Sequence, residues 1–232
     1  MNQDTRRRFL LGAAGTSLLF VGCAKGAAGE ANAPKGEQGE GVAPPEDLMR
    51  EHGALNRILL VYDEGARRLE AQQQMPIDAL AKSAEIIRRF IEQYHEKLEE
   101  DFLFPRFEKA NKLVELVATL RKQHVAGRGL TETVLRLSAS AVPKDEDRKH
   151  LIDALRAFTR MYRPHEARED TVLFPALRSV VTPKEFRELG ERFEDKEHEL
   201  FGKDGFEGIV TQVASIEQSL GLYDLNQFTP TP

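Results

Sequence analysis

The sequence predicts an all-α protein, an up-down-up-down bundle of four helices followed by extra helices at the C-terminus. Two observations carry this prediction. Apolar residues recur at helical spacing through four long segments that short connections join. A stretch of eleven residues also occurs twice, at 95–105 and 165–175, with six positions identical in the two copies. We interpret these copies as an internal repeat.

Residues 1–23 are typical of an export signal. Thr5-Arg6-Arg7-Arg8-Phe9-Leu10 precedes an apolar run rich in Gly and Ala, which resembles a twin-arginine signal and is too short for an ordinary transmembrane helix. Cys23 stands where a lipoprotein signal places its lipidated cysteine; the alternative is an incidental cysteine in a segment cleaved elsewhere. We therefore expect a periplasmic protein or one anchored to the membrane on that side.

Composition narrows the classes of partner and site. The 232 residues carry a formal net charge of -5, and no basic cluster occurs beyond the first few residues, which argues against a nucleic-acid partner. The single cysteine excludes an internal disulfide and a thiolate metal site. Residues 24–45 are rich in Gly, Ala, Glu and Pro, and we expect a flexible linker there.

The bundle is expected over residues 46–180. Its helices are predicted at 46–71, 78–104, 111–137 and 145–177, with Pro105 stopping or kinking the second. Residues 181–232 form the C-terminal extension: a charged helix that begins after Thr182 and ends near Phe201, an amphipathic helix at 206–220, and an extended tail. His150 and His198 stand among charged residues, and we expect both to be solvated.

Four other histidines interrupt the apolar stripes, one on each bundle helix: His52, His95, His124 and His165. Glu99 and Glu169 follow two of them by four residues, which places each His and Glu on one helix face. Buried ionisable groups cost several kcal/mol unless they are hydrogen-bonded, change protonation or bind a cation. Two cations could each take a pair of imidazoles, with both carboxylates bridging. Such ligands suit Fe or Mn and tolerate Zn. The alternative is a plain bundle with hydrogen-bonded core histidines.

Other residues near these histidines have more than one interpretation. Gly127 and Gly129 follow His124 and indicate close helix packing, space for a ligand, or a frayed helix. The tyrosines at core spacing either pack or tune the centre by hydrogen bonding or redox: Tyr62, Tyr94 and Tyr162.

The order His, His-x-x-x-Glu, His, His-x-x-x-Glu, with Leu-Phe-Pro after both acidic clusters, resembles the hemerythrin-like (HHE cation-binding) family over residues 46–180. The resemblance implies a non-haem di-iron centre. Its implied ligands are His52, His95, Glu99, His124, His165 and Glu169. Asp170 is an alternative to Glu169, since oxygen-carrying hemerythrins use an Asp at that offset. They also carry a second His where this chain has Arg128, which leaves the centre more open. A ferritin-like site needs two Glu-x-x-His motifs, and only Glu92 to His95 offers one.

Three functions follow as hypotheses. The first is an exported di-iron protein that binds oxygen, nitric oxide or iron itself, with a membrane tether through a lipidated Cys23. The second is a di-iron enzyme that reduces nitric oxide or peroxide or oxidises Fe(II). The third is a structural or interaction module with a vestigial site. Two iron ions are the expected cofactor ahead of Mn or Zn.

Overall fold

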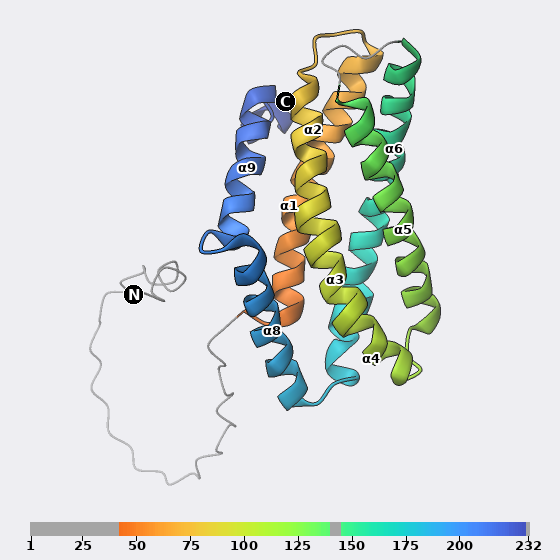
Figure 1. Cartoon of the computed structure of the whole chain (residues 1–232), viewed down its shortest axis with the longest axis vertical. Helices are drawn as coiled ribbons and strands as arrows, with labels where there is room; N and C mark the ends of the chain where they lie inside the picture. Colours follow the sequence, from red (N-terminus) through yellow and green to blue (C-terminus); the bar gives the residue numbers. More distant parts are fainter. Residues whose placement is uncertain (1–41, 140–144, 231–232) are drawn as a thin grey trace, which may run out of the picture. The chain divides into compact units, whose positions relative to one another are not determined.

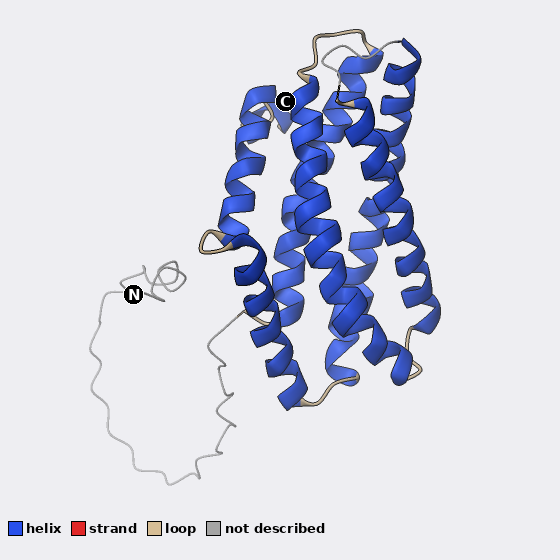
Figure 2. Cartoon of the chain, viewed as in Figure 1, coloured by secondary structure: helices blue, strands red, loops and turns tan. Residues whose placement is uncertain are grey.

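The structure is a computed structural model that describes residues 42–139 and 145–230 (Figure 1). Within these residues all regular secondary structure is helical and no strand occurs (Figure 2). The all-α prediction is therefore confirmed. The expected export signal at 1–23 and most of the expected linker at 24–45 lie outside the described residues.

The first bundle helix, α1, spans Pro44–Glu70. It begins two residues before the expected start, because a proline is well tolerated in the first turn, where its missing N–H has no intrahelical partner. Its stripe of Leu48, Leu55 and Leu59 is fully buried. Gly and charged residues occupy the opposite face, so one side of α1 is committed to the core.

The second bundle helix is continuous but changes its winding. It runs through α2 (Ile77–Ile86), a π-helical segment η2 (Ile87–His95), α3 (Glu96–Leu98), a second π-helical segment η3 (Glu99–Leu103) and α4 (Phe104–Lys109). Pro105 was expected to stop or kink this helix, and the structure shows that the helix does not stop there. The wider turn of η3, closed by the Phe104 N–H on the Glu99 carbonyl, places Pro105 in the first turn of α4, where no N–H is needed.

The third and fourth bundle helices complete the ring. Here α5 spans Val114–Leu137 and α6 spans Asp145–Arg168, followed by the π-helical η4 (Glu169–Leu173), α7 (Phe174–Ala176) and the short 3-10 helix η5 (Leu177–Ser179). The α6 helix packs on both α1 and α5, while α2 and η2 also pack on α1 and α5. Each helix therefore neighbours the next along the chain, as an up-down-up-down bundle requires.

The fourth bundle helix repeats the winding of the second. The Phe174 N–H bonds to the Glu169 carbonyl, as the Phe104 N–H bonds to Glu99. Both copies of the repeat therefore start a π-helical turn at the predicted glutamate and end it at the Phe-Pro pair. Single π-turns of this kind occur often at functional sites.

Two further helices cover the side of the bundle (Figure 1). α8 spans Pro183–Phe201 and begins with a capping box in which Thr182 and Glu185 exchange hydrogen bonds; α9 spans Gly205–Leu220. α9 packs on α1 and α2, and α8 on α1 and η2. The tail was expected to be extended, but Leu225–Phe228 forms a 3-10 turn (η6) because the Asp224 side chain accepts the Asn226 N–H.

None of the described helices is both long enough and apolar enough to cross a membrane.

Candidate metal centre

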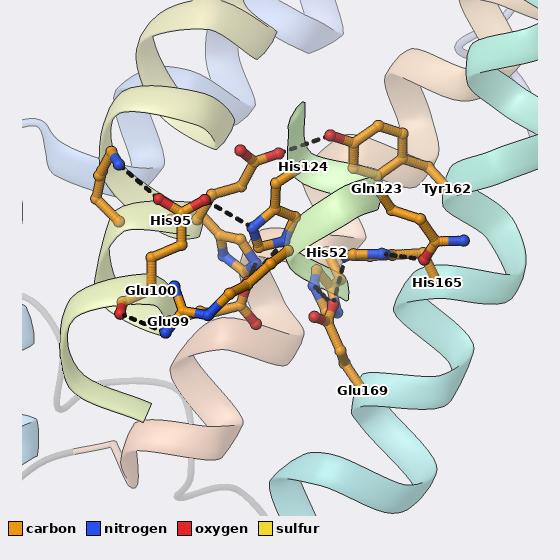
Figure 3. A network of polar contacts seen from close by, with 12 residues as sticks. His52, His95, Glu99, Glu100, Gln123, His124, Tyr162, His165 and Glu169 are labelled. Atoms are coloured by element: carbon orange, nitrogen blue, oxygen red, sulfur yellow. Dashed lines mark hydrogen bonds and ion pairs between the residues drawn. The ribbon is translucent and has the colours of Figure 1, made fainter. Parts of the chain in front are cut away.

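The six predicted side chains meet in the middle of the bundle, where they point toward one another (Figure 3). None of them is more than 4% exposed. They come from all four bundle helices: α1 carries His52, η2 and η3 carry His95 and Glu99, α5 carries His124, and α6 and η4 carry His165 and Glu169. The structure therefore brings together all six residues that the sequence singled out.

Each carboxylate lies between two imidazoles. One oxygen of Glu99 is 3.8 Å from His95 Nε2 and 3.5 Å from His124 Nε2. One oxygen of Glu169 is 3.1 Å from His165 Nε2 and 3.4 Å from His52 Nε2. Both carboxylates thus reach a histidine on their own helix and another on a bundle helix from the other half of the chain.

The six residues form two groups, each small enough to surround one cation. His52, His95 and Glu99 have ligand atoms within 4.8 Å of one another, and so do His124, His165 and Glu169. We call these the His52/His95 half and the His124/His165 half of the centre. The two halves touch through the carboxylates described above, and each half offers three ligand atoms that could hold one cation.

Each of the four central histidines has its outer nitrogen, Nδ1, hydrogen-bonded to a side-chain oxygen. His95 Nδ1 donates to Glu51 at 2.6 Å and His165 Nδ1 donates to Gln123 Oε1 at 2.9 Å. The other two donate to acids of the repeat: His52 Nδ1 to Asp170 at 2.8 Å and His124 Nδ1 to Glu100 at 3.1 Å. A proton on each Nδ1 leaves each Nε2 as a bare lone pair that faces inward, the tautomer that a metal ligand needs.

The inward atoms lack hydrogen-bond donors. Neither oxygen of Glu99 or of Glu169 accepts a hydrogen bond of ordinary geometry from any described residue, and His124 Nε2 has no partner there either. Lone pairs that face one another in a dry core repel, and each unpaired buried acceptor costs free energy. One or two cations at this point would satisfy all of them at once, so the donor set fits a metal without sulfur ligands.

Charge crowding is visible in the two central acids. Burial and the neighbouring charge of Glu169 raise the pKa of Glu99 well above its ordinary value. Burial also acts to raise the pKa of Glu169, but His165 and His52 outweigh it and hold that pKa below its ordinary value. The protein alone therefore disfavours two ionised carboxylates side by side, and a cation between them removes the conflict.

The outer partners also settle where Asp170 lies. Its carboxylate binds the Nδ1 side of His52, on the far side of the ring from the inward Nε2. Glu169 faces the centre instead. This geometry favours Glu169 over Asp170 as a ligand.

The Phe of each Leu-Phe-Pro motif covers a histidine from the other half of the chain. The rings of Phe174 and His52 stack with centroids 5.5 Å apart, and those of Phe104 and His124 with centroids 5.6 Å apart. Both phenylalanines are at most 1% exposed. The motif therefore closes one side of the centre with apolar surface, a role that the sequence pattern did not reveal.

Arg128 belongs to a polar network beside the centre. Its guanidinium donates to Glu96 at 2.7 Å and to Glu100 at 2.6 Å. The Tyr162 hydroxyl donates to the other oxygen of Glu96 at 2.6 Å. Tyr162 is therefore more than packing, and it lies against Gly127, which explains that glycine as a close helix contact. A Cβ atom added at Gly129 would meet nothing within 4 Å, so close packing does not require a glycine there.

The sequence reasoning missed Glu51, Gln123 and Glu96 as partners of the centre. The repeat held one signal: an acid follows each glutamate ligand, at Glu100 and Asp170, and both acids orient a histidine. The expectation for the two remaining histidines is confirmed, since His150 and His198 are exposed.

Comparison with known proteins covers the same part of the chain. The family model described as Hemerythrin HHE cation binding domain matches residues 43–177 and, in a second match, residues 117–219. The uncharacterized protein Rv1995 of Mycobacterium tuberculosis is 55% identical over 196 residues, which is 84% of this chain and 77% of that protein. The uncharacterized protein Mb2018 of Mycobacterium bovis matches with the same identity and coverage. No solved structure gives a significant match.

Proposed function

Because the chain belongs to the hemerythrin HHE cation-binding family, we propose that it holds two non-haem iron ions in the bundle core and binds oxygen, nitric oxide or iron itself there. The proposed ligands are the six inward residues, His52, His95, Glu99, His124, His165 and Glu169. One observation carries the proposal: the lone pairs of buried imidazoles face two buried carboxylates that no described residue satisfies.

Iron held by imidazole and carboxylate ligands supplies redox chemistry and a place for a small diatomic molecule. The chain itself orients the ligand side chains and excludes water from them. The outer hydrogen bonds hold each imidazole in one tautomer and orientation, so that little rearrangement is needed when a cation binds. Phe104 and Phe174 keep water from the histidines they cover. Both features favour a stable centre that admits only small ligands.

The first experiment is metal analysis of the purified protein with its optical spectrum. We expect about two irons per chain and a spectrum that changes when the reduced protein meets oxygen or nitric oxide. A double variant, His95→Ala with His165→Ala, is expected to lose the metal. Glu191→Gln, an exposed change on α8, is the control. A protein without bound metal, even after incubation with Fe(II), would contradict the proposal and leave a structural module.

The second candidate is a di-iron enzyme that reduces nitric oxide or peroxide or oxidises Fe(II). The observation that favours the enzyme is the residue four positions after His124. This chain has Arg128 there, whereas the oxygen-carrying hemerythrins that it resembles have another histidine ligand. Arg128 binds Glu96 and Glu100 and adds nothing to the centre. Steady turnover of one of these substrates, lost in Glu99→Ala and kept in Glu191→Gln, would establish the enzyme. Stoichiometric binding without turnover would support the binding protein.

The proposed location is outside the cytoplasmic membrane. The support is the twin-arginine pattern at Thr5 to Leu10 and Cys23 after the apolar run. Fractionation of cells that carry the full chain, compared with an Arg6→Lys and Arg7→Lys variant, tests export. Labelling with a radioactive fatty acid in the wild type and in Cys23→Ala tests the tether.

A further inference from the structure

We propose that the two halves of the centre are electronically unequal, and that Glu51 and Gln123 set the order in which the two metal positions are filled and oxidised. The His52/His95 half is the electron-rich one and takes the first cation. This inference rests on the proposed function, because it concerns how the chain's own residues act on the two metals.

Glu51 and Gln123 occupy equivalent places in the two halves of the bundle. Each stands one residue before a histidine of its helix, His52 on α1 or His124 on α5. Each side chain reaches the histidine of the following helix and accepts its Nδ1–H: Glu51 from His95 at 2.6 Å and Gln123 from His165 at 2.9 Å. The geometry is the same in both halves, but one acceptor is a carboxylate and the other a neutral amide.

The other pair of outer acceptors adds to the inequality. Asp170 accepts the Nδ1–H of His52 and Glu100 accepts the Nδ1–H of His124, and both acceptors are carboxylates. Glu100 also accepts from Arg128 at 2.6 Å and from Lys97 at 2.5 Å, which offset its negative charge. Among the described residues no Lys or Arg lies within ion-pair distance of Asp170.

The surroundings of the two acceptors differ as well. Glu51 is 1% exposed and lies in a buried group with Asp47 and Glu197, whose ligand oxygens all fall within 4.8 Å of one another. Gln123 is partly exposed. Glu51 thus lies buried among other acids, whereas Gln123 lies nearer to solvent.

A carboxylate that accepts the Nδ1–H of a ligating imidazole raises the basicity of its Nε2, and an amide does so less. Higher basicity strengthens the bond to a cation and stabilises the more highly charged oxidation state, so it lowers the reduction potential. The His52/His95 half should thus bind first and oxidise first.

Calorimetric titration of the metal-free full-length protein with Co(II) tests the order of binding. We expect two separate steps in the wild type. Glu51→Gln, which keeps the shape of the side chain, should weaken the tighter step by about 10- to 100-fold. Gln123→Glu should strengthen the weaker step by a similar factor. Each single variant makes the two halves more alike, so its two steps should move together. In the double variant the carboxylate and the amide have changed places, and two separate steps should be seen again. Glu191→Gln, the same chemical change on the exposed face of α8, should leave both steps unchanged.

A redox titration of the iron-loaded protein gives the second readout. We expect two one-electron steps whose separation shrinks in Glu51→Gln, because the lower of the two potentials rises. Two equal Co(II) steps with no response to either single variant would overturn the inference and leave the proposed function intact. Failure of the wild type to bind Co(II) or iron at all would overturn both. Circular dichroism of each metal-free variant separates a lost fold from a lost ligand.

Discussion

Gly127 on α5 and Tyr162 on α6 touch so closely that a Cβ atom on the glycine would overlap the tyrosine hydroxyl. Gly127→Ala is therefore expected to destabilise the protein by about 1–3 kcal/mol, because Tyr162 must move out of a packed core. Urea unfolding of the metal-free protein measures this. Gly129→Ala is the matched control: it is exposed, a Cβ there meets nothing within 4 Å, and the better helix former should add about 1 kcal/mol of stability. Equal effects of the two changes would contradict the close contact.

The Tyr162 hydroxyl satisfies one oxygen of the buried Glu96. Tyr162→Phe should cost about 1–3 kcal/mol of unfolding free energy, since that oxygen then lacks a donor. Tyr62→Phe tests the same atom change elsewhere in the core. The Tyr62 hydroxyl is buried without a hydrogen-bond partner among the described residues, so its removal should leave stability unchanged or slightly higher. A loss of stability in the second variant as large as in the first would show that the network around Glu96 has no special role.

Metal analysis of two single variants distinguishes Glu169 from Asp170 as a ligand. Glu169→Gln should lower the iron content well below that of the wild type, because a shared carboxylate is lost. Asp170→Asn should keep the iron but weaken its binding by about 10- to 100-fold, as expected for a residue that only orients His52. Iron content in each purified variant and competition with a chelator give both quantities. The reverse ranking would make Asp170 the ligand.

Glu64 gives the protein an acid-sensitive contact at the surface of α1. Its hydrogen bonds with Arg67, and then with Arg68, lower its pKa from 4.5 to about 2. A pKa lower in the folded state means that the carboxylate stabilises the fold above about pH 4.5 and that this contribution disappears as the pH falls toward about 2. Glu64→Gln should therefore be less stable than the wild type near pH 7 and equal to it at about pH 2, with a smaller difference in high salt. Urea unfolding at several pH values measures both; a constant difference across that range would be inconsistent with the ion pair.

The bundle and the six inward residues could be predicted from the sequence, because both produce a periodic pattern. The bundle produces an apolar stripe, and the site places a histidine and a glutamate one turn apart within that stripe. It was insufficient for the partners of the imidazoles. Glu51 and His95 are joined across helices, and nothing in the local pattern of α1 distinguishes a glutamate that reaches a neighbouring helix from one that faces solvent.

The continuation of the second helix past Pro105 was also beyond the pattern. A proline usually ends an α-helix, and only the π-helical turn from Glu99 to Leu103 makes it compatible with the helix here. A five-residue hydrogen-bonded turn has no composition of its own that would mark it in advance. The Leu-Phe-Pro motif marks the end of this turn in both copies, but only the structure shows that it does so.

Each half of the chain brings its own His, His and Glu, yet the acid that orients His52 comes from the second half and the acid that orients His124 comes from the first. Duplication of a single helical hairpin would explain this arrangement, because in a pair of identical hairpins each would place the same acid against the histidine of the other. The connection at 110–113, where Asn111 and Leu113 take positive φ, is the natural place to cut. Two fragments separated there would each carry a ligand set and would complete it only by reassembling, which makes the bundle suited to a split reporter for metal loading.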